Sequence, residues 1–106
     1  MNRQRQIDHF ELAAHRLAVQ RLRAQPGRTG EVSGQLAHWQ FLSGTSGSEV
    51  YWSEWKALLA GPLDALTDVV CAETDHATVL RSVLPLSVLI TQSERAQLVK
   101  QARQAA

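Results

Sequence analysis

Cysteine, proline and long apolar runs are all scarce in this chain of 106 residues. The single cysteine, Cys71, cannot form an internal disulfide, which fits a reducing compartment such as the cytoplasm. No apolar run approaches the roughly 18 residues of a membrane-spanning helix, and no apolar run of signal-peptide length follows the charged first residues. We therefore expect a cytoplasmic protein with no membrane segment.

Catalytic and ligand-binding motifs are also missing. No Cys/His group has zinc-ligand spacing, and His9 and His15, six residues apart, would lie about 240° apart around a helix. The segment "SGTSGS", 43–48, lacks the Lys-Ser/Thr ending of a phosphate-binding loop. No local spacing suggests a Ser/His/Asp or Cys/His arrangement. We expect a protein that is not an enzyme and needs no metal or cofactor, with Cys71 packed rather than reactive.

Apolar residues recur at helical spacing through nearly the whole chain, and no run alternates apolar with polar residues as a strand would. A hydrophobic content of 44% is enough for one modest core. We predict an all-α fold, a compact bundle of five or six short helices in a single domain, 1–106. The first helix should span about 7–24, and glycine and proline predict flexible loops at 25–34 and 43–48.

Half of the six aromatic residues, Tyr51, Trp52 and Trp55, fall in one predicted helix, 49–60. They occupy one arc of about 120° together with two leucines, which is the pattern of a core face. Trp52 lies at the edge of this arc and is therefore a candidate for an exposed contact. After this helix, Gly61 should supply a left-handed end and Pro62 the first position of the next helix.

Helix-capping signals mark the second half of the chain. Thr74 or Asp75 should cap a helix that ends at Pro85, and "TQSE", 91–94, has the spacing of a capping box that opens a final helix to about Gln104. Between them, "VLPLSVLI", 83–90, has one polar residue in eight. This segment should be buried or covered by a partner.

Charge is distributed unevenly. Residues 1–28 carry six arginines against two acidic residues, whereas acidic groups are in excess in the remainder. The first helix should place Arg16, Gln20 and Arg23 on one polar face and turn the opposite, apolar face inward, with more apolar surface than one core stripe requires. A basic face of this kind can attract an acidic protein or nucleic acid.

Three segments resemble a pattern found in short, mostly uncharacterised bacterial helical proteins. They are "YWSEWKALLAGPLDALTDVV" (51–70), "TDHATVLRSVLPLSVLITQSERAQL" (74–98) and, more weakly, "AAHRLAVQRLRAQPG" (13–27). Such proteins look like the antitoxin-like partner of a two-gene pair. The chain departs from the pattern at "SVLPLSVLIT", 82–91, where a more polar turn would be expected, and no functional residue is transferred from the resemblance.

Together, these features predict a non-catalytic protein–protein interaction module, an antitoxin-like regulator whose partner is a toxin encoded nearby or a second copy of itself. The candidate partner-binding residues are Arg16, Gln20, Arg23, Trp52, Leu86, Val88 and Ile90. The alternative is a DNA-binding transcriptional regulator that uses the first helix or the 92–104 helix. Its candidate nucleic-acid contacts are Arg5, Arg16, Arg23, Arg95 and Lys100.

Overall fold

The computed structural model describes residues 3–43, 49–82 and 85–105. The described residues form six α-helices and two short 3-10 helices, which confirms the predicted all-α bundle. The helices are α1 (Arg3–Ala24), η1 (Pro26–Arg28), α2 (Thr29–Ser43), α3 (Glu49–Ala60), α4 (Leu63–Val70), α5 (Asp75–Ser82), η2 (Pro85–Leu89) and α6 (Gln92–Ala105). Among these described helices, none is both long and apolar enough to cross a bilayer.

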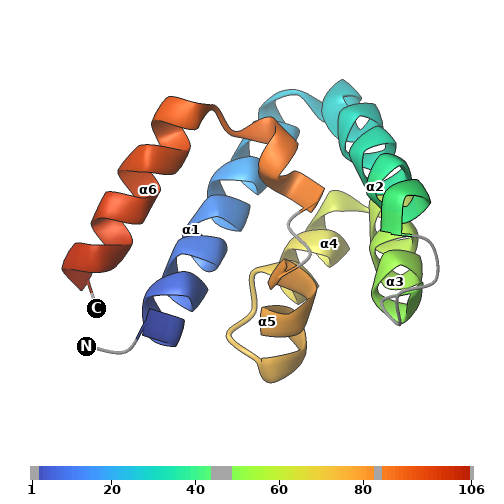
Figure 1. The fold of residues 1–106 in the computed structure, drawn as a ribbon. Helices are drawn as coiled ribbons and strands as arrows, with labels where there is room; N and C mark the ends of the chain where they lie inside the picture. Colours follow the sequence, from blue (N-terminus) through green and yellow to red (C-terminus); the bar gives the residue numbers. More distant parts are fainter. Residues whose placement is uncertain (1–2, 44–48, 83–84, 106) are drawn as a thin grey trace.

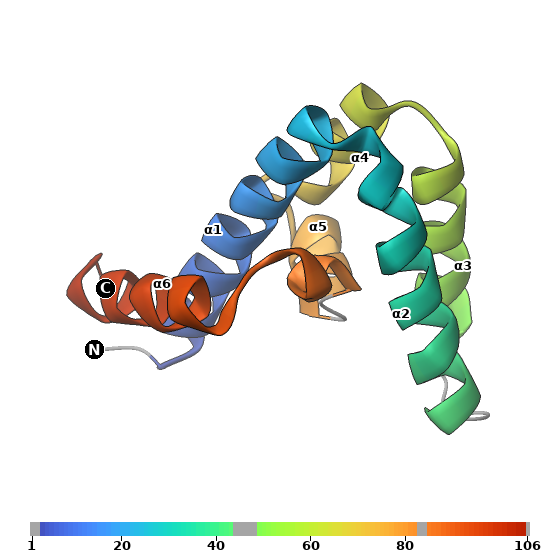
Figure 2. The same cartoon turned by 90° about the horizontal axis from the view of Figure 1, so that it is seen from above.

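Helix α1 is the central element of the bundle (Figure 1). Along one side it packs against α6, which runs antiparallel to it, and elsewhere it contacts α4, α5 and η2. Helices α2 and α3 lie side by side as an antiparallel hairpin whose free end projects away from α1 and α6 (Figure 2). The hairpin joins the rest of the fold mainly through η2 and α4.

The first predicted loop is wrong over most of its length. Helix α1 ends at Ala24 as expected, but a 3-10 turn follows at once and α2 begins at Thr29. The Thr29 hydroxyl donates to the Pro26 carbonyl at 2.8 Å, and Arg28 pairs with Glu31 at 2.7 Å. Gly30, read as a loop residue, lies in an open first turn where it costs the helix little. The second predicted loop, 43–48, falls almost wholly outside the described residues, except for Ser43, which ends α2.

The Gly61-Pro62 corner differs from the prediction in its backbone. Gly61 does not adopt a left-handed conformation, and its N–H donates to the Leu58 carbonyl at 3.2 Å. Pro62 is extended and serves as the N-cap of α4 rather than its first residue, since its carbonyl accepts the Leu66 N–H. The corner therefore joins α3 and α4 through two residues, of which Pro62 is extended.

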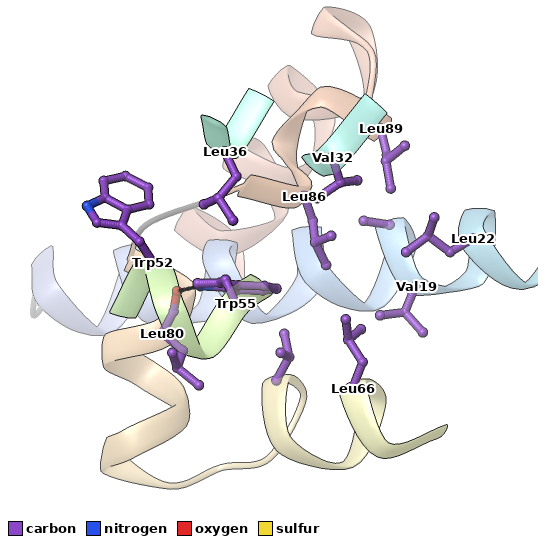
Figure 3. Packing of buried hydrophobic residues seen from close by; sticks show 12 residues of the cluster. Val19, Leu22, Val32, Leu36, Trp52, Trp55, Leu66, Leu80, Leu86 and Leu89 are labelled. Carbon is purple, nitrogen blue, oxygen red and sulfur yellow. Dashed lines mark hydrogen bonds between the residues drawn. The ribbon is translucent and has the colours of Figure 1, made fainter. Parts of the chain in front are cut away.

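Trp55 lies at the centre of the hydrophobic core (Figure 3). It is fully buried, and its indole Nε1–H donates to the Leu80 carbonyl of α5 at 2.9 Å. Leucine and valine side chains from four other elements surround it, namely Val19 and Leu22 of α1, Val32 and Leu36 of α2, Leu66 and Val70 of α4, and Leu86 and Leu89 of η2. The predicted core face of 49–60 is confirmed, because Trp52 and Trp55 are both buried on it.

The predicted capping box of the last helix is confirmed. The Thr91 N–H donates to Glu94 Oε1 at 2.8 Å, and the Glu94 N–H donates to Thr91 Oγ1 at 3.1 Å. Glu94 also accepts two hydrogen bonds from the Arg21 guanidinium, at 2.7 and 2.6 Å, while Arg21 donates to the Leu89 carbonyl at 2.7 Å. One arginine of α1 thus fixes the end of η2 and the start of α6.

We predict that Trp55→Phe lowers the free energy of unfolding by about 1–3 kcal/mol, because it leaves the buried Leu80 carbonyl without its donor. Urea denaturation followed by circular dichroism measures the change. The control is Trp39→Phe, the same replacement at a half-buried position of α2. A loss at position 39 equal to that at position 55 would contradict the role given to the Trp55 hydrogen bond.

Candidate protein-binding surfaces

The structure brings the three predicted polar contacts of α1 together in one groove. Arg16, Gln20 and Arg23 line a groove of about 480 Å³ between α1 and α4, opposite Thr67 and Asp68 of α4. Arg23 is already occupied, since its guanidinium pairs with Asp64 at 2.9 Å and donates weakly to the Thr67 hydroxyl at 3.4 Å. The groove therefore offers less free positive charge than the sequence suggested.

Two apolar members of the predicted contact set are wrong. Trp52 is only 7% exposed and Leu86 only 1%, because both side chains belong to the core cluster around Trp55. Of the other two, Val88 is 37% exposed and Ile90 is half-buried. The apolar 83–90 segment thus uses Leu86 and Leu89 to join α1 to the hairpin, and Val88 and Ile90 remain the only surface-accessible predicted contacts from it.

The predicted nucleic-acid contacts do not form one continuous face. Arg16 and Arg23 line the groove between α1 and α4, whereas Arg95 lines a separate groove between α1 and α6. The Arg95 guanidinium carbon lies 5.5 Å from the centroid of the Phe10 ring, a cation–π contact. Arg5 and Lys100 are exposed and line neither groove.

Three exposed apolar residues lie at the free end of the hairpin. Phe41 is 84% exposed, Leu42 67% and Val50 64%. Phe41 and Leu42 lie in the last turn of α2 and Val50 in the first turn of α3, so the three residues belong to the same end of the hairpin, the projecting end in Figure 2. We call them the apolar tip.

A group of buried polar residues was also missed. Glu11 and His15 of α1 and Arg81 of α5 are all buried. Arg81 donates to the carbonyls of Val70 and Ala72, both at 2.7 Å, and so closes the turn between α4 and α5. The sequence spacing did not single out Glu11 or His15 as buried, yet both lie on the buried face of α1 together with Ala14 and Ala18.

His15 is held as a neutral imidazole. Its Nδ1 lies 2.7 Å from the Glu11 carbonyl, its ring centroid lies 5.9 Å from that of Trp55 with the two planes tilted by 31°, and its Nε2 is buried with no partner in the described structure. Because a carbonyl only accepts, Nδ1 carries the proton. Burial, and the nearby positive charge of Arg81, lower the His15 pKa to about 4 even though the hydrogen bond to Glu11 opposes this.

The surroundings of Cys71 and of the His76–Glu54 pair do not favour reactive chemistry. Burial raises the pKa of the Cys71 thiol in the α1–α4 groove, which disfavours the nucleophilic thiolate. His76 Nε2 lies 2.6 Å from Glu54 Oε2, but this pair is on the surface, outside both grooves. Within the described residues, no group of three or more His, Cys, Asp or Glu side chains could hold a metal ion.

We predict that the protein loses stability as the pH falls from about 6.5 to about 4. In this window the unfolded chain binds a proton at His15 that the folded chain excludes, so the free energy of unfolding drops by roughly 3 kcal/mol. Burial raises the pKa of Glu11, which acts in the opposite sense, and Arg21 lowers the pKa of Glu94 to about 2, which acts at lower pH. Denaturation curves of the native protein and of His15→Leu isolate the His15 contribution. An identical pH slope in both proteins would contradict the assignment.

Comparisons with known proteins add no relative to these observations. No protein-family model matches the chain, and no match is found among the curated proteins or the solved structures.

Proposed function

We propose that this protein is a non-catalytic protein–protein interaction module, an antitoxin-like regulator that acts by binding a partner protein through the apolar tip. The carrying observation is the exposure of Phe41, Leu42 and Val50 at one end of the hairpin. Scattered apolar residues are ordinary on a protein surface, but a phenylalanine, a leucine and a valine gathered at one projecting end are typical of a contact site.

Burial of the tip would supply a substantial part of a binding energy. Covering a side chain such as Phe or Leu gains about 1.5–3 kcal/mol, and aromatic anchors contribute much of the affinity of protein interfaces. The tip is also separate from the Trp55 core, so it could be covered without refolding of the bundle. The resemblance of residues 13–98 to antitoxin-like helical proteins supports the same class of function.

The DNA-binding alternative receives less support. Arg23, one of its main candidates, pairs with Asp64, and the remaining basic candidates are divided among separate surfaces. A protein that grips the phosphate backbone needs several unpaired cations on one face. The arrangement around α1 and α4 does not offer that.

We predict that the double substitution Phe41→Ser with Leu42→Ser abolishes or weakens complex formation by at least about tenfold, since it removes the two most exposed apolar anchors. Binding is measured by co-purification with the product of the adjacent gene and by sedimentation of the protein alone, which reports a homodimer. Because both residues are exposed, the free energy of unfolding should change by less than about 0.5 kcal/mol per site.

The matched control is Val79→Ser, which replaces another partly exposed apolar residue, on α5 rather than at the tip. It should leave complex formation unchanged. A strictly monomeric protein that does not bind the neighbouring gene product would overturn the proposal, as would tip variants that bind as well as the native chain.

A further inference from the structure

Helix α6 rests on α1 and makes no comparable contact with any other described helix. Helix α6 therefore forms one edge of the bundle, away from the α2–α3 hairpin (Figure 1). A helix pair of this kind buries apolar residues only where the two helices meet, and a third helix would normally cover the seam. Along this seam lies the second groove, of about 340 Å³.

The α1–α6 groove is lined by apolar side chains from both helices. Ile7 and Phe10 come from α1, and Val99 and Ala102 from α6. Ile7 is 38% exposed, and Phe10 and Val99 are only partly buried, so the seam retains apolar surface that α6 does not cover.

Three arginines line the same groove: Arg3, Arg95 and Arg103. None of the three forms an ion pair with the described residues, whereas Arg21, Arg23 and Arg28 are paired with Glu94, Asp64 and Glu31. The only acidic residue in the lining is Glu11, whose pKa is raised by burial and by Asp8. The groove therefore combines an apolar surface with unpaired positive charge.

We infer that the α1–α6 groove binds an acidic amphipathic helix of a partner protein. Such a helix would place its apolar face on Ile7, Phe10 and Val99, and its carboxylates beside Arg3, Arg95 and Arg103. Duplex DNA would meet the arginines but would leave the apolar lining uncovered, so the chemistry favours a peptide. The inference rests on the proposed function only in that the protein acts by binding another protein, because it uses a different surface from the apolar tip.

The test uses a fluorescent peptide of about 18 residues, or about five helical turns, with leucines on one face and glutamates on the other. Fluorescence anisotropy should show that it binds at least about tenfold more tightly than the same peptide with lysine in place of glutamate. The double substitution Arg95→Glu with Arg103→Glu should weaken binding by about tenfold or more, and Ile7→Ser should weaken it without changing its salt dependence.

Lys100→Glu is the matched control, because it makes the same charge reversal on α6 outside the groove. It should change the affinity by less than about threefold. Equal binding of acidic and basic peptides, or no effect of the arginine double substitution, would overturn the inference. Tighter binding of a duplex of about 20 base pairs, lost in the same double variant, would also overturn it and identify a nucleic-acid site instead. A change confined to self-association would overturn it in favour of a second copy of the chain.

The two proposals fail separately. Substitutions at the apolar tip should leave peptide binding in the groove unchanged, because the tip lies at the far end of the hairpin. Peptide binding with no tip-dependent complex would remove the proposed function alone, and a tip-dependent complex with no peptide binding would remove the groove alone.

Discussion

The indole of Trp55 is the contact on which the arrangement of the bundle depends. It touches α1 through the His15 ring, donates to the Leu80 carbonyl of α5, and is surrounded by leucines of α2, α4 and η2. Four short helices of 8 to 15 residues have little stability alone, so their positions are set by packing around this side chain. His15 can remain buried and neutral because the same packing excludes water from its ring. The candidate binding surfaces, the apolar tip and the α1–α6 groove, lie outside this core.

The helices themselves could largely be predicted from local signals. The proline after α1, the arc of aromatic residues on α3 and the Thr91–Glu94 capping box all act within a few residues, and the structure contains each of them. The α2 boundary was missed because Gly30 and Gly34 are tolerated within this helix, where a Cβ at either position would meet open space. Which side of a helix is buried depends on contacts distant in the sequence. Arg81, for example, is buried because its guanidinium reaches two carbonyls at the end of α4, which no local spacing reveals.

The candidate surfaces were harder to predict for the same reason. Trp52 stood at the edge of an amphipathic arc, and its burial in the core cluster depends on how the helices pack together. Phe41 and Leu42 are exposed at the projecting end of the hairpin, away from the core cluster around Trp55. The basic charge of α1 can be counted from the sequence, but its ion pairs cannot be predicted from it. In the structure, Arg21 and Arg23 form ion pairs with Glu94 and Asp64. The unpaired arginines gather instead where α6 lies on α1, beside apolar side chains.

The described surface of this protein therefore carries an apolar tip at one end and a basic, partly apolar groove at the other, both outside the core around Trp55. Amide hydrogen exchange of the protein with and without the product of the adjacent gene tests this account most directly. The account predicts added protection at the end of α2 and the start of α3, around Phe41 and Val50. A complex that protects other segments and leaves these two unchanged, or the absence of any complex, would contradict it.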